Sequence, residues 1–173
     1  MWSSDRSIAG RRSAARWATI AAVAVLVSGC GFRLAGTAPL PALLARPHLS
    51  LSDPYSDFAR VFGQQLRASG AILEASDATA TATVDVSRDT VEQRVLSVSA
   101  QNIPTEYLLI YTVTYSVRRA GKVVLPPQTI SLSQDYSFSE QAVLAKEHEA
   151  DRLRRQMARE LAAIAMRRIA GLK

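Results

Sequence analysis

Few residues in this 173-residue chain could do nucleophilic or metal chemistry: one cysteine, Cys30, and two histidines, His48 and His148. A single cysteine leaves no intrachain disulfide framework to expect. The thiol of Cys30 directly follows residues 27–29 (Val-Ser-Gly), which end an uncharged run that begins at Trp17. Small residues at the end of such a run are typical of a cleavage site for exported proteins. Covalent modification of Cys30 is therefore the first chemistry that the sequence indicates.

The residues around His148 do not complete a zinc-enzyme motif. His148-Glu149 begins like the helix of a zinc protease, but Arg152 occupies the position of the second histidine. The chain contains no Gly-x-Ser-x-Gly sequence and no phosphate-binding loop. We therefore predict that the protein is not an enzyme. We expect no metal, and no cofactor apart from a covalent lipid on Cys30.

The first 29 residues have the parts of an export signal. A basic leader comes first, with four arginines against one aspartate: Arg6, Arg11, Arg12, Arg16 and Asp5. The apolar run that follows is shorter than the roughly 20 residues of a permanent membrane-spanning helix. We therefore predict that residues 1–29 are a signal peptide that is removed.

Residues 27–30 (Val-Ser-Gly-Cys) resemble the bacterial lipobox, in which the cysteine thiol receives a diacylglycerol and becomes the new N-terminus. The resemblance implies lipidation of Cys30, and the alternative is an ordinary secretory signal followed by an unmodified cysteine. Gly31 follows with no aspartate nearby, which for such lipoproteins implies the periplasmic face of the outer membrane. Acyl chains contribute about 0.8 kcal/mol per buried methylene, so several chains anchor a domain without a spanning helix.

Removal of the leader leaves residues 30–173, a length that suits a single domain. The formal charge of +6 then falls to about +3, with 17 basic and 14 acidic residues. An exported chain with this excess suits anionic lipid headgroups or a phosphorylated glycolipid better than nucleic acid. Glycines and prolines recur between residues 31 and 41, so we interpret 30–45 as a lipidated tether and 46–173 as the domain.

Periodicity indicates the elements that must position these residues. His48–Leu51 alternates as a short first strand. Asp53-Pro54 should cap and open a helix over residues 54–69, and Gly70 should end it. The helix carries an apolar stripe that we interpret as core, with a binding groove as the alternative: Tyr55, Phe58, Phe62 and Leu66.

Three strands should follow this helix. The first covers residues 80–88 and continues over 91–99 past a kink near Arg88-Asp89, with Leu96, Val98 and Ala100 on one side. The second, 105–118, is the clearest in the chain. Its first face should be covered by helices, and it comprises Tyr107, Leu109, Tyr111, Val113, Tyr115 and Val117. Its opposite face is apolar only at Leu108 and Ile110 and then becomes polar: Thr112, Thr114 and Ser116.

A hairpin turn at residues 119–122 leads into the last strand, in which Pro126-Pro127 cannot donate to a ladder. We therefore predict a sheet edge or a bulge there. From about Gln141 to Ile169 the composition is helical, and Asp151 and Arg155 stand four apart with the acid first, which supports an exposed face. The helix should bury Leu153, Met157, Leu161 and Ile164. Its other arginines form a solvated face or, alternatively, meet an anionic partner: Arg152, Arg154, Arg159 and Arg167.

These elements predict an α+β domain. One mixed, mostly antiparallel sheet of about four strands should pack against two helices, in the order strand, helix, strand, strand, strand, helix.

Three stretches in this order resemble one family, the lipopolysaccharide-assembly lipoproteins called LptE or RlpB. They are Gly29-Cys30-Gly31-Phe32-Arg33-Leu34 at the start of the mature chain, Glu106-Tyr107 at the opening of the long strand, and Leu144-Ala145-Lys146-Glu147-His148-Glu149-Ala150-Asp151. The order of strands and helices also matches this family. The resemblance therefore covers nearly the whole mature chain.

The resemblance implies a lipoprotein that plugs the outer-membrane β-barrel LptD, helps the barrel assemble and takes part in lipopolysaccharide insertion at the outer leaflet. It also implies direct binding of lipopolysaccharide through a lysine, here Lys146, whose ammonium suits a lipid A phosphate. Lys146 could instead be a surface residue at a helix start. The arginine that accompanies this lysine in the family aligns near Ala100, and Arg94 is the only arginine close to that position.

Two other classes of function remain open on sequence grounds. One is a different outer-membrane lipoprotein, such as a secretin pilotin or a periplasmic lipid carrier, and a carrier would need an enclosed apolar cavity. The other is a periplasmic enzyme, which would need a cleft lined by convergent polar residues.

Overall fold

The computed structural model describes residues 40–137 and 143–172, with the side chains of the second range described from residue 148. All of these residues belong to one compact unit, Thr37–Lys173. The predicted signal peptide, Cys30 and most of the predicted tether lie outside the described residues.

Four strands and two α-helices make up the described domain. In chain order they are β1 (Pro47–Leu51), α2 (Asp57–Ala68), β2 (Ala82–Val98), β3 (Pro104–Arg119), β4 (Lys122–Ser137) and α3 (Val143–Ala170). The strands form one sheet in the order β1-β2-β3-β4, in which β1 is parallel to β2 and the other pairs are antiparallel. The predicted α+β fold and its element order are therefore confirmed.

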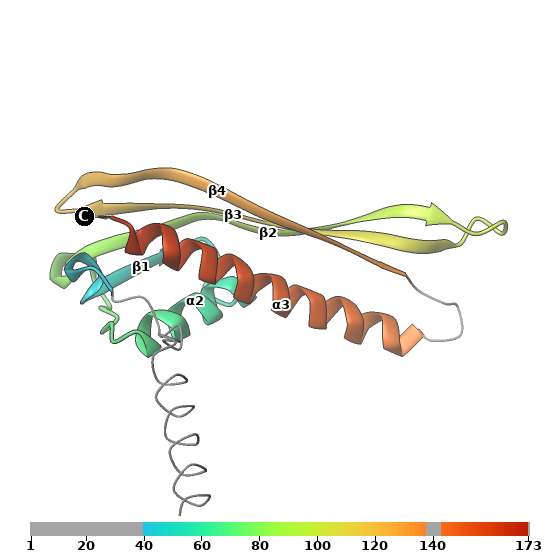
Figure 1. Ribbon diagram of the computed structural model, residues 1–173, viewed down its shortest axis with the longest axis horizontal. Coiled ribbons are helices and arrows are strands. Elements are labelled where there is room, and N and C mark those ends of the chain that lie inside the picture. The colour runs from blue at the N-terminus through green and yellow to red at the C-terminus, as the bar shows by residue number, and fades with distance from the viewer. Residues whose placement is uncertain (1–39, 138–142, 173) are drawn as a thin grey trace, which may run out of the picture. The chain divides into compact units, whose positions relative to one another are not determined.

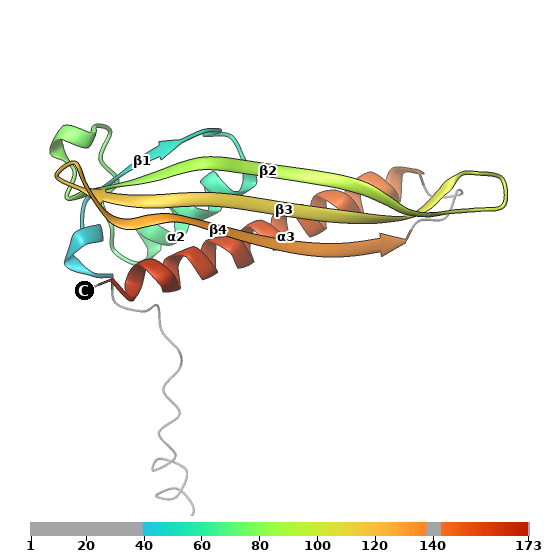
Figure 2. The same ribbon diagram turned by 90° about the horizontal axis from the view of Figure 1, so that it is seen from above.

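Both helices lie on the same face of the sheet, as the two views in Figures 1 and 2 show. The β2–β3 hairpin projects beyond the end of β4 in Figure 2. With 16 residues at about 3.3 Å each, β3 alone is roughly 50 Å long. The described part of the domain is therefore two layers deep, and no helix of residues 40–137 or 143–172 lies over the second sheet face.

The core lies between the helices and one face of β3. The six residues predicted for the covered face are all buried, with exposed fractions of 8% or less: Tyr107, Leu109, Tyr111, Val113, Tyr115 and Val117. Alternate residues of β3 point to the opposite face and are half-buried. Strict alternation along a half-covered strand thus fixes which side of the sheet the helices occupy.

α2 is shorter at its start than predicted. Ser56, and not Asp53, is the N-cap, because its Oγ accepts a hydrogen bond from the backbone N–H of Ala59 at 2.9 Å. Asp53 instead accepts from the N–H of Tyr55 in the turn before the helix. Tyr55 therefore lies outside the helix and is 89% exposed, so its assignment to the apolar stripe was wrong.

The remainder of the predicted α2 stripe is core. Phe58, Phe62 and Leu66 are at most 1% exposed, and the two phenyl rings stack with centroids 5.3 Å apart. Gly70 follows the helix at φ 95°, where its N–H donates to the carbonyl of Arg67 at 2.9 Å. This positive φ explains why a glycine ends the helix.

β2 is one continuous strand with a bulge near the predicted kink. The register shifts between Val86 and Arg88, which leaves Ser87 without a partner across the pair. The buried apolar residues before this bulge are Ala82, Val84 and Val86, whereas after it Asp89, Val91 and Gln93 pair with the buried face of β3. The bulge therefore reverses which side chains of β2 face the helices.

The two predictions for the β3–β4 hairpin are confirmed. Arg119 pairs with Lys122 around a two-residue turn in which Ala120 and Gly121 both have positive φ, at 48° and 76°. Pro126-Pro127 lies on the edge strand β4, between the pairs Val117–Leu125 and Tyr115–Gln128, where the register shifts. The prolines thus occupy a stretch in which the ladder is already interrupted.

α3 runs over Val143–Ala170 and buries the predicted stripe, with Ile164 partly buried at its margin. Between the long residues of the stripe, Ala158, Ala162 and Ala165 are fully buried, which lets the helix approach its neighbours closely. Arg155 is exposed, as its spacing from Asp151 predicted. Asp151 pairs with Arg154, three residues on, whose guanidinium also lies 3.7 Å from Asp57 of α2. Among the described residues, no helix has the length and hydropathy needed to cross a bilayer.

Candidate functional site

Arg94 lies on the sheet face that the helices leave open. It stands opposite Leu108 in the β2–β3 pair, and Leu108 belongs to the uncovered face of β3. Only the bulge at Ser87 puts it there, because without the shift Arg94 would share the face of Val84 and Val86. Its side chain is 65% exposed and forms an ion pair with Glu92 at 2.9 Å. Arg94 is therefore an accessible cation that is already paired.

Lys146 lies in the first turns of α3, and its side chain is outside the described part. The helix that carries it packs against the covered face of the sheet. Lys146 therefore belongs to a helix on the covered side of the sheet, whereas the side chain of Arg94 is on the uncovered face. Cys30, the predicted lipidation site, is outside the described residues as well.

Hydroxyl groups line the uncovered face between β3 and β4. Across the strands, the Oγ1 of Thr112 is hydrogen-bonded to the Oγ of Ser131 at 3.0 Å, and the Oγ1 atoms of Thr114 and Thr129 are hydrogen-bonded at 3.0 Å. Each hydroxyl keeps further capacity for water or a polar partner. The predicted polar second face is therefore confirmed. The cross-strand pairing was not predicted, although the alternate Thr and Ser residues of both strands were a visible signal for it.

The β2–β3 hairpin carries exposed apolar side chains toward its tip. Val95, Leu96 and Val98 are 50–52% exposed, and Ile103 in the turn is 39% exposed. Leu96 and Val98 were predicted to share one side, but a second register shift separates Val95 from Ser97 and another separates Ser97 from Val98. Exposed apolar residues that gather in one place mark an interaction surface.

Neither histidine belongs to a metal site in the described part of the chain. The Nδ1 of His48 lies 3.0 Å from the backbone carbonyl of Glu74, so this side chain joins β1 to the segment after α2. Near His148, Arg152 donates through Nε to Glu149 at 2.9 Å, and this hydrogen bond lowers the pKa of the Glu149 carboxyl. The described residues contain no group of three His, Cys, Asp or Glu that could hold a metal ion.

A polar cluster holds the start of α2 against the sheet. The Tyr111 hydroxyl accepts from the N–H of Phe58 at 3.0 Å and donates to Asp89, which also accepts from the Ser56 hydroxyl. Burial raises the pKa of Asp89, while the hydrogen bonds from Ser56 and Tyr111 act in the opposite direction. Burial, with the Asp89 charge beside it, also raises the pKa of Tyr111. These groups are bonded to one another, so we assign the cluster a structural role.

The α3 arginines divide into two groups. Arg152 and Arg154 pair with carboxylates and belong to a solvated or structural face. Arg159 and Arg167 are exposed, and no ion pair is described for either. An anionic partner therefore remains an alternative only for Arg159 and Arg167.

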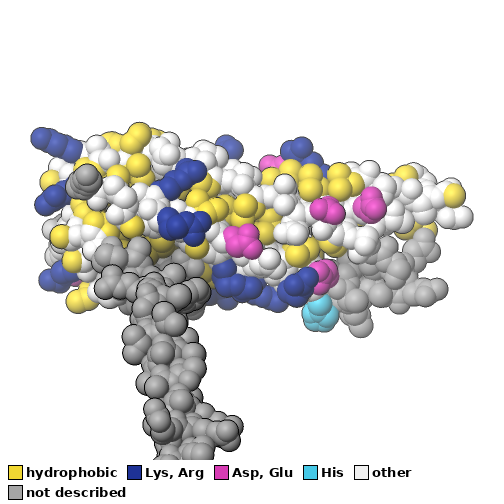
Figure 3. Space-filling view, in the orientation of Figure 1, with side chains coloured by type: hydrophobic (Ala, Val, Ile, Leu, Met, Phe, Trp, Pro, Cys, Tyr) yellow, Lys and Arg dark blue, Asp and Glu magenta, His cyan; other side chains and the backbone are white. Residues whose placement is uncertain are grey.

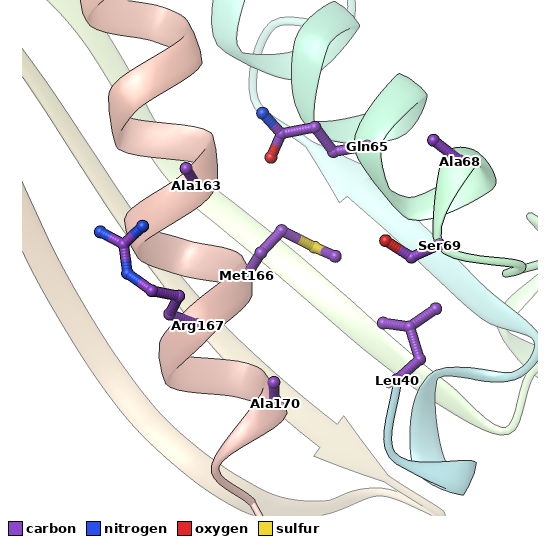
Figure 4. A pocket seen from close by; sticks show the side chains of 8 residues that line it. All are labelled: Leu40, Gln65, Ala68, Ser69, Ala163, Met166, Arg167 and Ala170. Atoms are coloured by element: carbon purple, nitrogen blue, oxygen red, sulfur yellow. The ribbon is translucent and has the colours of Figure 1, made fainter. Parts of the chain in front are cut away.

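A groove of about 220 Å³ lies between the C-terminal parts of α2 and α3, and we call it the α2–α3 groove. It is lined by Leu40, Gln65, Ala68, Ser69, Ala163, Met166, Arg167 and Ala170. Figure 4 shows Met166 extending from α3 toward Ser69 and Leu40, while Arg167 leaves the helix on the other side. None of the lining residues is fully buried, so the groove is open to the surface.

The chain matches a family model described as LptE, lipopolysaccharide-assembly, over residues 47–169. Proteins from Yersinia pestis (strain Pestoides F) and Yersinia pseudotuberculosis (serotype O:1b) named LPS-assembly lipoprotein LptE are each 32% identical over 137 residues. That region is 78% of this chain and 66% of each relative, so the chain spans slightly less than two thirds of their length.

Solved structures share the fold. Rare lipoprotein B from Shewanella oneidensis is 27% identical with a TM-score of 0.62, covering 72% of this chain and 93% of that one. Lipoprotein B from Nitrosomonas europaea, at 21% identity, has a TM-score of 0.66 over 81% of this chain and 90% of that one, which supports the fold alone. Assembly, which is what the family description names, is not catalysis, and this confirms the prediction that the chain is not an enzyme. Because the family model covers nearly the whole described domain, from β1 to the end of α3, the chain belongs to the LptE family of lipopolysaccharide-assembly proteins.

Proposed function

We propose that this protein is an outer-membrane lipoprotein, acylated on Cys30 and held on the periplasmic side, that plugs the LptD β-barrel. In this role it assists assembly of the barrel and insertion of lipopolysaccharide at the outer leaflet, by binding and not by catalysis. The observation that carries the proposal is the family match across residues 47–169. The Yersinia relatives are named as LPS-assembly lipoproteins, which supports the same role here.

The uncovered sheet face supports a plug in a hydrated lumen. Its threonine and serine pairs offer hydroxyls to water and to polar side chains, and such wet interfaces are not weak. The exposed valines and Leu96 near the hairpin tip offer an apolar contact to the same partner. A polar flank with an apolar tip suits a protein that is surrounded by a largely polar wall.

Pull-down from solubilised outer membranes tests the partner. We expect the full chain to recover a β-barrel that mass spectrometry identifies as LptD. Leu96→Asp should reduce the recovery, because it places a charge on the apolar tip, while Tyr55→Asp, at a more exposed side chain away from that tip, should not. Recovery of a secretin, or of the free monomer alone, would contradict the proposal.

Lys146 and Arg94 are the proposed lipopolysaccharide-binding residues. Lys146→Asp should weaken glycolipid binding more than Arg155→Asp, a matched change at an exposed arginine of the same helix. Arg94→Gln tests the second residue separately, because Arg94 lies on the other side of the sheet and already pairs with Glu92. Unchanged binding in either variant would remove that residue from the site.

Lipidation at Cys30 has a direct test. Intact-mass analysis of the protein from native membranes should give a chain that begins at Cys30 and carries a diacylglycerol. Cys30→Ser should abolish the added mass and leave the protein unprocessed. A native protein that retains its leader, or an unmodified thiol, would refute the proposed anchor.

A further inference from the structure

The second half of β2 is an open sheet edge. β1 pairs with β2 only from Ala82 to Val86, and within residues 40–137 and 143–172 no strand pairs with the outer side of β2 beyond that point. Figure 2 shows this part of β2 bordering the sheet with no strand beside it. Such an edge presents a row of backbone N–H and C=O groups with which an extended segment can pair.

The run Thr90–Leu96 on this edge is exposed on both of its faces. Val91 and Val95 turn toward the helix side, because they pair with the buried Tyr111 and Tyr107 of β3, yet they are 37% and 51% exposed. A hollow of about 380 Å³ lies on that side, lined by Val91, Gln93, Leu109, Ala150, Asp151 and Arg154. The edge therefore offers apolar side chains as well as backbone groups.

The charges of this run make it complementary to itself. Glu92 and Arg94 both lie on the uncovered face, on either side of Gln93. If two copies pair antiparallel with Gln93 opposite Gln93, Glu92 of each copy stands opposite Arg94 of the other. The same register sets Val91 opposite Val95 on the helix side.

The neighbouring registers are worse matches. A shift of two residues in one direction sets Glu92 opposite Glu92, and a shift in the other direction sets Arg94 opposite Arg94. Like charges directly opposite each other are destabilising, whereas unlike charges and apolar pairs stabilise a ladder. Both faces of the run therefore favour the register that is centred on Gln93.

We propose that the open edge of β2 pairs with the same edge of a second copy of this chain, antiparallel and centred on Gln93. Two Glu92–Arg94 ion pairs between the copies then replace the pair within each chain, which is 2.9 Å long. Over the middle of the face in Figure 3, Lys and Arg side chains lie beside Asp and Glu side chains, so no field of one sign repels a second copy there.

The dimer is a form of the protein that has no barrel around it. A copy that fills a barrel lumen leaves no room for a second copy at this edge. Pairing between copies shields the edge from other strands until a barrel partner is present. The inference does not rest on the proposed function, since it uses only the sheet edge and its side chains.

Sedimentation equilibrium tests the pairing on residues 37–173, the compact unit of the structure, with no lipid or glycolipid present. We expect a reversible monomer–dimer equilibrium that weakens at high salt, because exposed ion pairs are screened. Glu92→Arg and Arg94→Glu should each raise the dissociation constant about 30-fold, since each turns two attractive contacts into two repulsive ones. Arg119→Glu, at an exposed arginine of β3 away from this edge, should change it less than twofold.

A mixture of the two charge variants separates pairing between copies from the pair within a chain. In each variant positions 92 and 94 carry the same charge, so the pair within the chain stays broken. Between a Glu92→Arg chain and an Arg94→Glu chain, however, position 92 of each faces the opposite charge at position 94 of the other. We therefore expect the equimolar mixture to form dimers about as well as the wild type, although neither variant does so alone.

A cysteine at the centre of the pairing tests the register. Cys30 is the only cysteine of the chain, so residues 37–173 contain none. Residues directly opposite in an antiparallel pair have Cβ atoms about 4.5–5.5 Å apart, so Gln93→Cys should link two copies through a disulfide on mild oxidation. Val123→Cys is the control, because this β4 side chain is 59% exposed and lies away from the β2 edge, and it should stay unlinked.

Several outcomes would overturn the proposal. A monomer at every concentration would exclude the pairing, and if Glu92→Arg then also lost LptD in the pull-down, the barrel would be the occupant of this edge. A dimer that the charge variants leave unchanged would mean association through another surface, such as the edge of β4. Equal linking of Gln93→Cys and Val123→Cys would mean random collision. Recovery of LptD by the wild type does not depend on these results, so the two proposals fail separately.

Discussion

Replacing Tyr111 by phenylalanine tests how the start of α2 is held to the sheet. The Tyr111 hydroxyl accepts from the N–H of Phe58, a residue that is 0% exposed, and donates to the half-buried Asp89. Tyr111→Phe keeps the buried ring but leaves this N–H without its acceptor, which costs about 1–3 kcal/mol. The substitution also removes one hydrogen-bond donor from the Asp89 carboxylate. We therefore expect the free energy of unfolding at pH 7 to fall by about 3 kcal/mol, which corresponds to a Tm about 10 °C lower.

The loss of stability in Tyr111→Phe should depend on pH. The pKa of Asp89 is raised above its ordinary value of 3.8. The stability that Asp89 contributes is therefore present below pH 3.8 and is lost as the pH rises through the raised pKa. Without the Tyr111 donor the pKa of Asp89 should rise further. The variant should then lose more stability than the wild type as the pH is raised. The destabilisation by Tyr111→Phe should therefore be greater at pH 7 than at pH 4.

Urea denaturation at the two pH values measures both quantities. Tyr55→Phe is the control, because Tyr55 is 89% exposed and its replacement should change stability by less than about 0.5 kcal/mol. An equal destabilisation by Tyr111→Phe at pH 4 and pH 7 would show that the hydroxyl does not stabilise the Asp89 carboxylate. A loss below about 0.5 kcal/mol would refute the whole account of the cluster.

Three further changes have defined outcomes. Leu161→Ala removes a fully buried side chain from α3 and should lower the free energy of unfolding by about 2–5 kcal/mol in guanidinium denaturation. Gly121→Ala puts a side chain at φ 76° in the β3–β4 turn and should cost about 1–2 kcal/mol, measured in the same way. Hydrogen bonds from Thr79 and Arg46 lower the pKa of Glu74, so the stability that Glu74 provides is present above its ordinary value of 4.5 and is lost as pH falls through the lowered pKa. The difference in Tm between the wild type and Glu74→Gln should therefore shrink as the pH is lowered below 4.5.

The sequence alone determined the elements and their order, because each depends on local periodicity. Alternation along β3 predicted which face would be buried, and it was correct at every position from Tyr107 to Val117. Pro126-Pro127 and Gly121 indicated an edge and a turn through backbone chemistry that needs no tertiary context. Cys30 as a lipidation site also comes from local sequence, and it stays a prediction.

Several residues could be placed only by the tertiary structure. Asp53 and Ser56 are both good caps, and Ser56 starts the helix where the Tyr111–Asp89 cluster fixes it. Arg154 and not Arg155 pairs with Asp151, on the side of α3 where Asp57 of α2 also lies close. Neither choice is encoded in spacing, because both depend on side chains from distant parts of the chain.

The side of the sheet on which Arg94 lies depends on a single extra residue. Continuous alternation from Val84 and Val86 would place Arg94 under the helices, and the bulge at Ser87 moves it to the open face. The α2–α3 groove likewise exists only because two helices far apart in sequence meet at alanines. Local periodicity was therefore sufficient to predict the helices and strands of this protein. Strand register and helix packing decided which charged and apolar side chains are accessible to a partner.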